Sequence, residues 1–351
     1  MRKYFFVISL FLLLFSCISD KKLISNPNFT KIAMNPLSNE KLSTRAILID
    51  KNKVWYAGNN GNYGFISLDT LADFKGNIAK ENLKLEFRSI AQTSKYIFIL
   101  SIGNPALLYR IAKDNSAIKL VYQENHEKVF YDSMQFLNEE EGFAVGDPTE
   151  DCPSIIKTTN GGESWTKISC KNLPKFAEGE AFFATSNTNL VLKDDTMWLA
   201  SGGKKSKIYR SIDKGEIWEI FETPIVQGEA MTGIFTADFY DENIGFITGG
   251  NYEKQDQNYS NKAITKDGGV TWKLIDDNKA FGYASCVQFL PNSGGKSLVV
   301  VANSGVFYYR QKDKKWKQLS DEKELYTIRF IDDKTAIAAG KNKIFKIEFK
   351  K

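Results

Sequence analysis

Three short segments of the sequence follow one spelling, and this repetition constrains the fold more than any other feature. Residues 158–165, 211–218 and 265–272 each read Thr/Ser-x-Asp/Asn-x-Gly-x-x-Trp. We expect each to form a tight turn in which the Asp or Asn side chain accepts backbone N–H groups, the Gly takes a positive φ and the Trp leads into the next strand. The tryptophans recur 53 and 54 positions apart. A self-similar period of this length predicts a repeat architecture.

The rest of the sequence favours β-structure. Aromatic residues make up 13% of the chain, runs of Val, Ile, Phe and Tyr bounded by Gly recur along it, and no long amphipathic helix is evident. Alignment on the repeats yields seven units, each with an inner strand, a second strand that ends near Gly, a third strand, a turn and a fourth strand. Seven such sheets predict an all-β, seven-bladed β-propeller.

The last unit runs out of chain after its third strand, residues 343–349, which would leave an exposed sheet edge. The N-terminal residues 29–32, Phe-Thr-Lys-Ile, resemble residues 165–168, Trp-Thr-Lys-Ile, which begin a fourth strand. We therefore expect residues 29–34 to pair with the C-terminal blade and close the ring. Residues 28–351 then form one propeller domain.

The first residues are typical of a secretory signal. Arg2 and Lys3 precede an apolar run over residues 4–15 that is too short and wrongly flanked for a stable membrane span. The following Leu14-Phe15-Ser16-Cys17 resembles the bacterial lipobox. That resemblance implies removal of residues 1–16, lipidation of Cys17, a polar tether over residues 17–27 and an extracytoplasmic protein held on a bacterial membrane, at the outer membrane or cell surface. The alternative is an ordinary cleaved signal with a chance cysteine.

Composition argues against several function classes. The net charge of +5 is modest and Lys and Glu are interspersed, so nucleic-acid binding has little support. The one histidine, His126, lies in a polar stretch, and no Gly-x-Ser-x-Gly elbow accompanies it. The cysteine spacings do not suggest a zinc site, and no phosphate-binding glycine loop precedes a helix. We expect no metal or other cofactor, and a monomer.

The cysteines point to an oxidising compartment. Cys152 and Cys170 lie symmetrically about Gly161, the centre of a predicted outer hairpin, as antiparallel partners would. We predict a disulfide between them; the alternative is two free thiols. Cys286 is expected to be a small buried core residue.

Propeller geometry places the functional face. Inner strands begin, and second strands end, on the same face of the disc, whereas the repeated turns lie on the other. One position from each inner strand gives Arg45, Arg88, Asp132, Glu180, Thr232, Ala284 and Tyr326, and Tyr283 lies next to that level. The ends of the second strands add Asp147 and Asn251, and Asn251 begins the longest polar loop, residues 251–259.

From these rings we predict a ligand-binding set of Arg45, Arg88, Asp132, Asp147, Glu180, Asn251, Tyr283 and Tyr326. Paired arginines are suited to holding a carboxylate through bidentate hydrogen bonds. The alternative interpretation is that these charges satisfy one another around a water-filled channel.

The repeated turn resembles the Asp-box, or BNR repeat, of sialidase-like propellers. This resemblance implies a glycoside hydrolase acting on acidic sugars, with Asp132, Glu180 and Tyr326 as candidate catalytic residues. The chain departs from that pattern, because the third arginine, Arg329, lies three residues further along its strand than Arg88 and residues 45–47 do not read Arg-Ile-Pro.

A second resemblance is to the photosystem II stability and assembly factors, over residues 29–351. It rests on Gly142-Phe143-Ala144-Val145-Gly146-Asp147 followed by the first repeated turn. It implies binding of a membrane-protein partner without turnover. We therefore expect a propeller that binds a protein, peptide or glycan at its channel face, in the assembly of membrane or surface components, and keep the sialidase-like hydrolase as the alternative.

Overall fold

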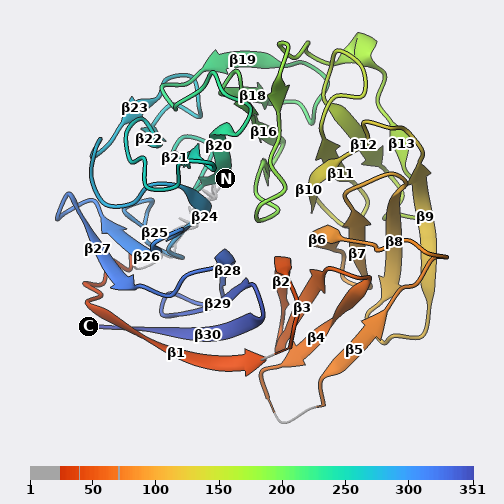
Figure 1. Cartoon of the computed structure of the whole chain (residues 1–351), viewed down its shortest axis with the longest axis horizontal. Coiled ribbons are helices and arrows are strands. Elements are labelled where there is room, and N and C mark those ends of the chain that lie inside the picture. Colours follow the sequence, from red (N-terminus) through yellow and green to blue (C-terminus); the bar gives the residue numbers. More distant parts are fainter. Residues whose placement is uncertain (1–23, 39, 70–71) are drawn as a thin grey trace, which may run out of the picture.

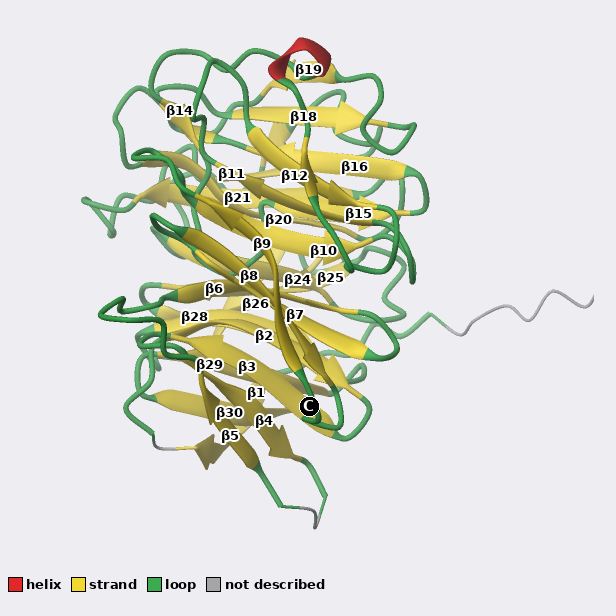
Figure 2. Cartoon of the chain, turned by 90° about the vertical axis from the view of Figure 1, so that its right-hand side faces the viewer, coloured by secondary structure: helices red, strands yellow, loops and turns green. Residues whose placement is uncertain are grey.

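The computed structural model describes residues 24–38, 40–69 and 72–351, so the predicted signal and Cys17 lie outside the described residues. Seven antiparallel sheets stand in a ring around a central axis (Figure 1), which confirms the seven-bladed propeller. Seen from the side, the strands run between two faces of the disc and the loops gather at both faces (Figure 2). Across these ranges no helix has the length and apolar character needed to cross a membrane.

Blades 1 to 3 follow the chain without interruption. Blade 1 holds β2 (Thr44–Asp50), β3 (Lys53–Gly58), β4 (Asn62–Ser67) and β5 (Phe74–Asn77). Blade 2 holds β6 (Phe87–Gln92), β7 (Tyr96–Ser101), β8 (Ala106–Ala112) and β9 (Ile118–Glu124). Blade 3 holds β10 (Tyr131–Phe136), β11 (Gly142–Gly146), β12 (Ser154–Thr158) and β13 (Thr166–Lys167), and a 3-10 turn, η1 (Cys170–Asn172), follows it.

Blades 4 and 5 share two extra short strands. Blade 4 holds β15 (Leu190–Lys193), β16 (Thr196–Ala200), β18 (Lys207–Ser211) and β19 (Glu219–Glu222). Blade 5 holds β20 (Thr232–Phe239), β21 (Gly245–Asn251), β22 (Lys262–Thr265) and β23 (Lys273–Leu274). The short strands β14 (Glu180–Ala181) and β17 (Gly202–Gly203) pair with each other and extend the sheet of blade 5 beyond β20.

The ring is closed by the N-terminal strand. Blade 6 holds β24 (Ala284–Phe289), β25 (Ser297–Ala302), β26 (Gly305–Arg310) and β27 (Lys315–Ser320), and blade 7 holds β28 (Leu325–Phe330), β29 (Thr335–Gly340), β30 (Lys343–Lys350) and β1 (Lys31–Ser38). Strand β1 pairs antiparallel with β30 from Lys31 opposite Lys350 onward. The closure prediction is confirmed, although the strand begins two residues later and ends four residues later than expected.

The hydrophobic core consists of layers between neighbouring blades. One cluster joins each adjacent pair around the ring, and the cluster between blades 7 and 1 completes the circle. Trp198, for example, is fully buried between blades 4 and 5 and stacks on Phe239 with ring centroids 4.0 Å apart. Strands buried on both faces read as continuous apolar runs, which explains why so many of these segments lack strict alternation.

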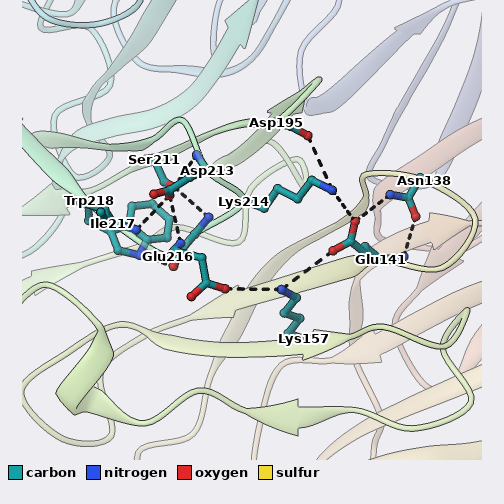
Figure 3. Close-up of polar contacts among 11 residues, drawn as sticks. Asn138, Glu141, Lys157, Asp195, Ser211, Asp213, Lys214, Glu216, Ile217 and Trp218 are labelled. Atoms are coloured by element: carbon teal, nitrogen blue, oxygen red, sulfur yellow. Dashed lines mark hydrogen bonds and ion pairs between the residues drawn. The ribbon is translucent and has the colours of Figure 1, made fainter.

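The three repeated turns have the expected geometry. In the second of them Asp213 Oδ1 accepts the backbone N–H groups of Glu216 and Ile217 at 3.1 and 2.9 Å, and Trp218 precedes β19 (Figure 3). Equivalent bonds run from Ser164 N to Asn160 and from Thr271 N to Asp267. The glycine in each turn has a positive φ between 78° and 92°, where a side chain would be strained.

Ion pairs join this second turn to blade 3. Lys214 lies 2.9 Å from Glu141 and 3.7 Å from Asp195, and Lys157 contacts both Glu141 and Glu216 (Figure 3). These pairs are partly exposed, so each contributes little to stability.

Cys152 and Cys170 form a disulfide, with their Cα atoms 5.6 Å apart, as the symmetry about Gly161 predicted. Cys286 is a free, fully buried thiol on β24. The disulfide fastens η1 to the loop after β11, beside the interface of blades 3 and 4.

Residues 182–189, which we call the plug, cross the channel before β15 begins. The plug is the green part of the chain that reaches inside the ring in Figure 1. Asn187 donates to Ile90 O of blade 2 and accepts from Met134 N of blade 3, both at 2.8 Å. On the opposite side Ser186 Oγ donates to Ser285 O of blade 6 at 2.6 Å, and Arg329 of blade 7 donates to Ser186 O at 2.8 Å. The plug therefore ties blades 2 and 3 to blades 6 and 7 across the channel.

We predict that Asn187→Gly destabilises the protein by about 2–6 kcal/mol, because two buried backbone groups lose their partners at about 1–3 kcal/mol each. Glycine retains the backbone conformation of Asn187, whose φ is +60°. Urea denaturation measures the change. The matched control is Asn342→Gly at an exposed position with φ +59°. Equal effects of the two changes would show that the bonds across the channel contribute nothing.

Candidate functional site

A β-bulge in six of the inner strands aims one side chain at the channel. The residue omitted from the pairing register is Arg45 in β2, Arg88 in β6, Asp132 in β10, Phe235 in β20, Ser285 in β24 and Tyr326 in β28. A bulge leaves its extra residue unpaired and re-aims its side chain. These residues form one level of the ring at the face where the inner strands begin.

In two blades the residue at this level of the ring is not the one that the sequence predicted. The predicted position in blade 5, Thr232, precedes the bulge residue Phe235 by three, and Ala284 in blade 6 precedes Ser285 by one. The hydroxyls that follow the bulges hold neighbouring inner strands together. Ser133 Oγ accepts from Leu190 N and Thr236 Oγ1 accepts from Val287 N, each at 3.1 Å.

Two arginines form the positive side of this level. The Arg45 guanidinium lies 3.9 Å from the centroid of the Tyr326 ring, within the range of a cation–π contact. No ion pair to Arg45 occurs in the described part of the chain, and its buried Nε lacks a hydrogen-bond partner there. Burial and the neighbouring Arg88 charge lower the pKa of Arg45. Arg88 is bound by Glu86, whose Oε1 accepts at 2.6 and 2.8 Å. Arg45 is therefore a cation without a counter-ion.

Two carboxyls lie beside Arg88. Asp132 is fully buried, and within the described ranges neither of its oxygens has a hydrogen-bond partner. Burial, followed by the charge of Asp147, raises the pKa of Asp132 well above its usual range, although the charge of Arg88 and the nearby backbone N–H groups of Asp147 and Ala184 oppose the shift. Asp147 Oδ1 accepts the backbone N–H of Phe182 in the plug at 2.8 Å. Burial raises the pKa of Asp147 to about 6.

Aromatic side chains form the remaining side. Phe183 of the plug stacks on Phe235 with centroids 3.9 Å apart, and Tyr283 stands edge-on to Phe235 at 4.8 Å. Tyr252 packs edge-on against Tyr283 at 5.2 Å and is 40% exposed. Met231 completes this cluster. The loop that begins at Asn251 thus contributes an aromatic side chain at the rim.

These three sides enclose a cavity of about 390 Å³, which we call the cup. Arg45, Arg88 and Asp147 line it on one side, and Phe235, Met231 and Tyr252 line it on the other. Phe183, Ala184 and Thr185 of the plug also line it. A second cavity of about 340 Å³ opens between the same inner strands and is lined by plug residues Asn187 and Thr188. The plug separates the two, so the cup is blind.

The structure corrects the predicted position of Glu180. We expected Glu180 to begin the fourth inner strand, but that strand is β15, ten residues later, and Glu180 lies on β14. Its carboxylate is fully buried and accepts from Ser201, Tyr209 and Lys207 at 2.5, 2.6 and 3.3 Å. These bonds direct Glu180 into blade 4, away from the channel, and remove it from the catalytic and ligand-binding candidates.

Some of the other predicted residues line the cup, and the rest lie behind it or outside it. The cup surface includes Arg45, Arg88 and Asp147, while Asp132, Tyr283 and Tyr326 lie directly behind it. Asn251 is buried, donates to Glu229 at 3.0 Å and accepts from Glu253 N and Lys254 N, so it orders its own loop. Sequence reasoning missed Phe183, Phe235 and Tyr252. Phe235 comes from the bulge in β20, Phe183 from the plug and Tyr252 from the loop after β21, and none of these features has a motif.

The second cavity contains a buried carboxyl, Asp238. Asp238 lines it together with Lys193 and Arg329, and Asp238 Oδ2 accepts from Phe289 N at 2.6 Å. Burial raises the pKa of Asp238 to about 6, although that bond and the two cations oppose the shift. The folded protein therefore binds a proton at Asp238 more tightly than the unfolded chain, whose Asp pKa is about 3.9.

We predict that Asp238 makes the protein less stable as pH rises from about 4 to 7, because ionisation becomes costly in the folded state only. The Asp238→Asn variant keeps the bond to Phe289 N and should gain stability relative to the natural chain over this range, by about 2–3 kcal/mol at about 1.4 kcal/mol per unit of pKa. Urea denaturation at pH 4.5 and 7.5 measures it, with exposed Asp194→Asn as the control. A difference independent of pH would contradict the prediction.

The chain is similar to solved propellers in structure only. No protein-family model and no curated protein matches the sequence. The structure of YCF48 bound to D1 peptide aligns with a TM-score of 0.65 at 11% identity, over 93% of this chain and 100% of that one. YCF48 from Cyanidioschyzon merolae aligns with a TM-score of 0.63 at 12% identity, over 91% and 98%. The WD40 repeats of RRP9 give 0.63 at 12%, over 92% and 99%. At this identity the likeness shows a shared propeller fold.

Proposed function

We propose that this propeller is a binding protein that captures a peptide segment of a protein partner in the cup. One observation carries the proposal: Arg45 is a half-buried cation that has no counter-ion among the described residues, and it lies at the edge of a cavity whose far side is apolar. Leaving such a charge unpaired is costly, so an anionic ligand group gains strongly there. A carboxylate suits the site, because a guanidinium binds it with two parallel hydrogen bonds.

The shape of the cup selects the part of the peptide that enters. Because the plug closes the channel, a chain cannot thread through it, and the cup volume of about 390 Å³ suits one or two residues. A free carboxyl terminus combines a small anionic group with a side chain that can lie on Phe235, Met231 and Tyr252. We therefore assign the cup to the carboxyl-terminal residues of the partner. The neighbour YCF48 binds D1 peptide, and this supports a peptide as the ligand class.

Isothermal titration with peptides of one sequence tests the proposal. Each peptide is prepared with a free carboxyl terminus and as the amide, and a third form carries an internal Glu and an amidated end. We expect the free acid to bind at least tenfold more tightly than the amide. Equal binding of acid and amide would overturn the proposed role of the cup. A preference for sialic or uronic acid sugars over every peptide would instead favour a glycan ligand and reopen the hydrolase interpretation.

We also propose that the protein is anchored at Cys17 outside the cytoplasm, with the cup directed away from the membrane. Residues 24–28 are held by hydrogen bonds on one face of the disc. Ser25 N donates to Asn292 O in the turn after β24, and Ser25 Oγ donates to Asp333 in the turn after β28. Both turns lie on the face opposite the cup, and Cys17 precedes Ile24 by seven residues.

Metabolic labelling with a fatty-acid analogue checks the anchor. The label should be incorporated into the natural chain and be lost in Cys17→Ser, which should leave the membrane fraction. Labelling that persists in Cys17→Ser, or membrane association that does not depend on Cys17, would refute the anchor without affecting the role of the cup.

A further inference from the structure

The acidic side of the cup, Asp132 and Asp147, has no ion-pair partner among the residues that the structure describes. Asp147 lines the cup, and within the described ranges the one hydrogen bond of its carboxylate is that of Oδ1 with the Phe182 N–H. No ion pair reaches Asp132 or Asp147 from the described residues. The charge of Arg88 favours the ionised form of Asp132, but the Nε and Nη2 atoms of Arg88 bind Glu86. A carboxyl that is buried without a partner normally has a role beyond packing.

Asp132 makes this an organised site. It is 0% exposed, and among the described residues neither of its oxygens has a hydrogen bond of ordinary geometry, although the backbone N–H groups of Asp147 and Ala184 lie near the carboxyl. The bulge in β10 places Asp132 at the same level as Arg45 and Arg88. Asp132 lies close enough to Asp147 for the charge of Asp147 to disfavour ionisation of Asp132. The fold thus maintains two adjacent acids where one apolar residue would be more stable.

We propose that Asp147, supported by Asp132, binds a basic group of the same ligand whose carboxylate Arg45 holds, so that the partner ends in Lys or Arg. This inference rests on the proposed function, because it places both groups in one cup. The aliphatic stem of such a residue fits the wall formed by Phe235 and Met231, as long cationic side chains bury their stems on apolar surfaces.

The protonation of the pair supports this assignment. Burial keeps the pKa of both carboxyls raised, so the empty cup retains a proton that a bound ammonium or guanidinium replaces. A neutral last residue offers no such replacement and leaves the acids unpaired. The cup would then discriminate between basic and neutral termini by charge, because the two share the same apolar contacts.

Four peptides of one sequence test the inference in the full-length protein. They end in Lys or norleucine, each as the free acid and as the amide. Norleucine has the aliphatic stem of Lys without its charge. In the natural protein we expect the Lys acid to bind about tenfold to a hundredfold more tightly than the norleucine acid, as a charge-assisted hydrogen bond implies.

In Asp147→Asn, which keeps an acceptor for Phe182 N–H, this ratio should fall to about one while the preference for acid over amide remains. The control Asp238→Asn removes an equally buried carboxyl outside the cup and should leave the ratio unchanged.

These measurements distinguish failure of the basic subsite from failure of the proposed function. If norleucine and Lys acids bind equally and both exceed their amides, the basic subsite is overturned and the proposed function stands. If acids do not exceed amides, the proposed function fails. A ratio that persists in Asp147→Asn overturns the role of Asp147. Asp132→Asn tests the positioning role of Asp132: a reduced ratio supports it, and an unchanged ratio in a normally folded variant overturns it.

Discussion

Replacing Arg45 with Gln should weaken binding of a peptide with a free carboxyl terminus by roughly 30- to 1000-fold, which corresponds to about 2–4 kcal/mol. Glutamine removes the charge and the two parallel donors, while the apolar side of the cup is unchanged. The stacking partner Tyr326 stays in place, since it belongs to β28. Isothermal titration of the acid and the amide measures the effect, and only the acid should lose affinity.

Arg310→Gln is the control for the Arg45 experiment. Arg310 lies on β26 and pairs with Asp313 at 2.7 Å, outside the cup, so its replacement should not change binding. Equal losses for acid and amide in Arg45→Gln would mean that the variant disturbs the fold or the apolar wall. An unchanged affinity for the acid would show that Arg45 does not hold the ligand.

Phe29→Ala should destabilise the propeller by about 3–5 kcal/mol, the range for removing a buried aromatic side chain. Phe29 is 1% exposed and lies between Tyr308 of blade 6 and Phe349 of blade 7, with ring centroids 5.3 and 5.2 Å away. It holds the chain against both blades just before β1 begins, so its loss weakens the pairing that closes the ring. The midpoint of urea denaturation reports the change.

Ile24→Ala is the matched change in the same N-terminal segment. Ile24 is 56% exposed, and its truncation should alter stability by less than about 0.5 kcal/mol. If Phe29→Ala also fell within that limit, closure of the ring would rest on the backbone pairing of β1 with β30 alone.

Sequence patterns predicted the parts of the fold that depend on local chemistry. The Asp213 turn needs only a short side chain that accepts hydrogen bonds, a glycine and a tryptophan at fixed spacing, so the sequence motif predicts the geometry of the turn. Closure by β1 follows from the missing fourth strand, and the disulfide between Cys152 and Cys170 follows from antiparallel symmetry. Each of these inferences uses neighbours within one blade, or a count of strands.

The position of Arg45, Arg88 and Asp132 on one level was also within reach of sequence alignment, because three successive blades have similar length. Asn251 was correctly placed at the end of a second strand, yet its amide bonds to Glu229 and its own loop. A polar side chain turns toward a nearby hydrogen-bond partner, and an alignment of the repeats does not show which side chains have such a partner.

What the sequence by itself determined is therefore the seven-bladed ring, its repeated turns and the face on which charged side chains gather, since these follow from short-range periodicity and turn chemistry. Only the tertiary structure decided which side chains share the cup. The bulges in β20 and β24 shifted the ring to Phe235 and Ser285, and the plug displaced Glu180 and introduced Phe183. Both features are stabilised by hydrogen bonds between blades distant in sequence, such as those of Asn187 to Ile90 and Met134, and such contacts leave no periodic pattern in the chain.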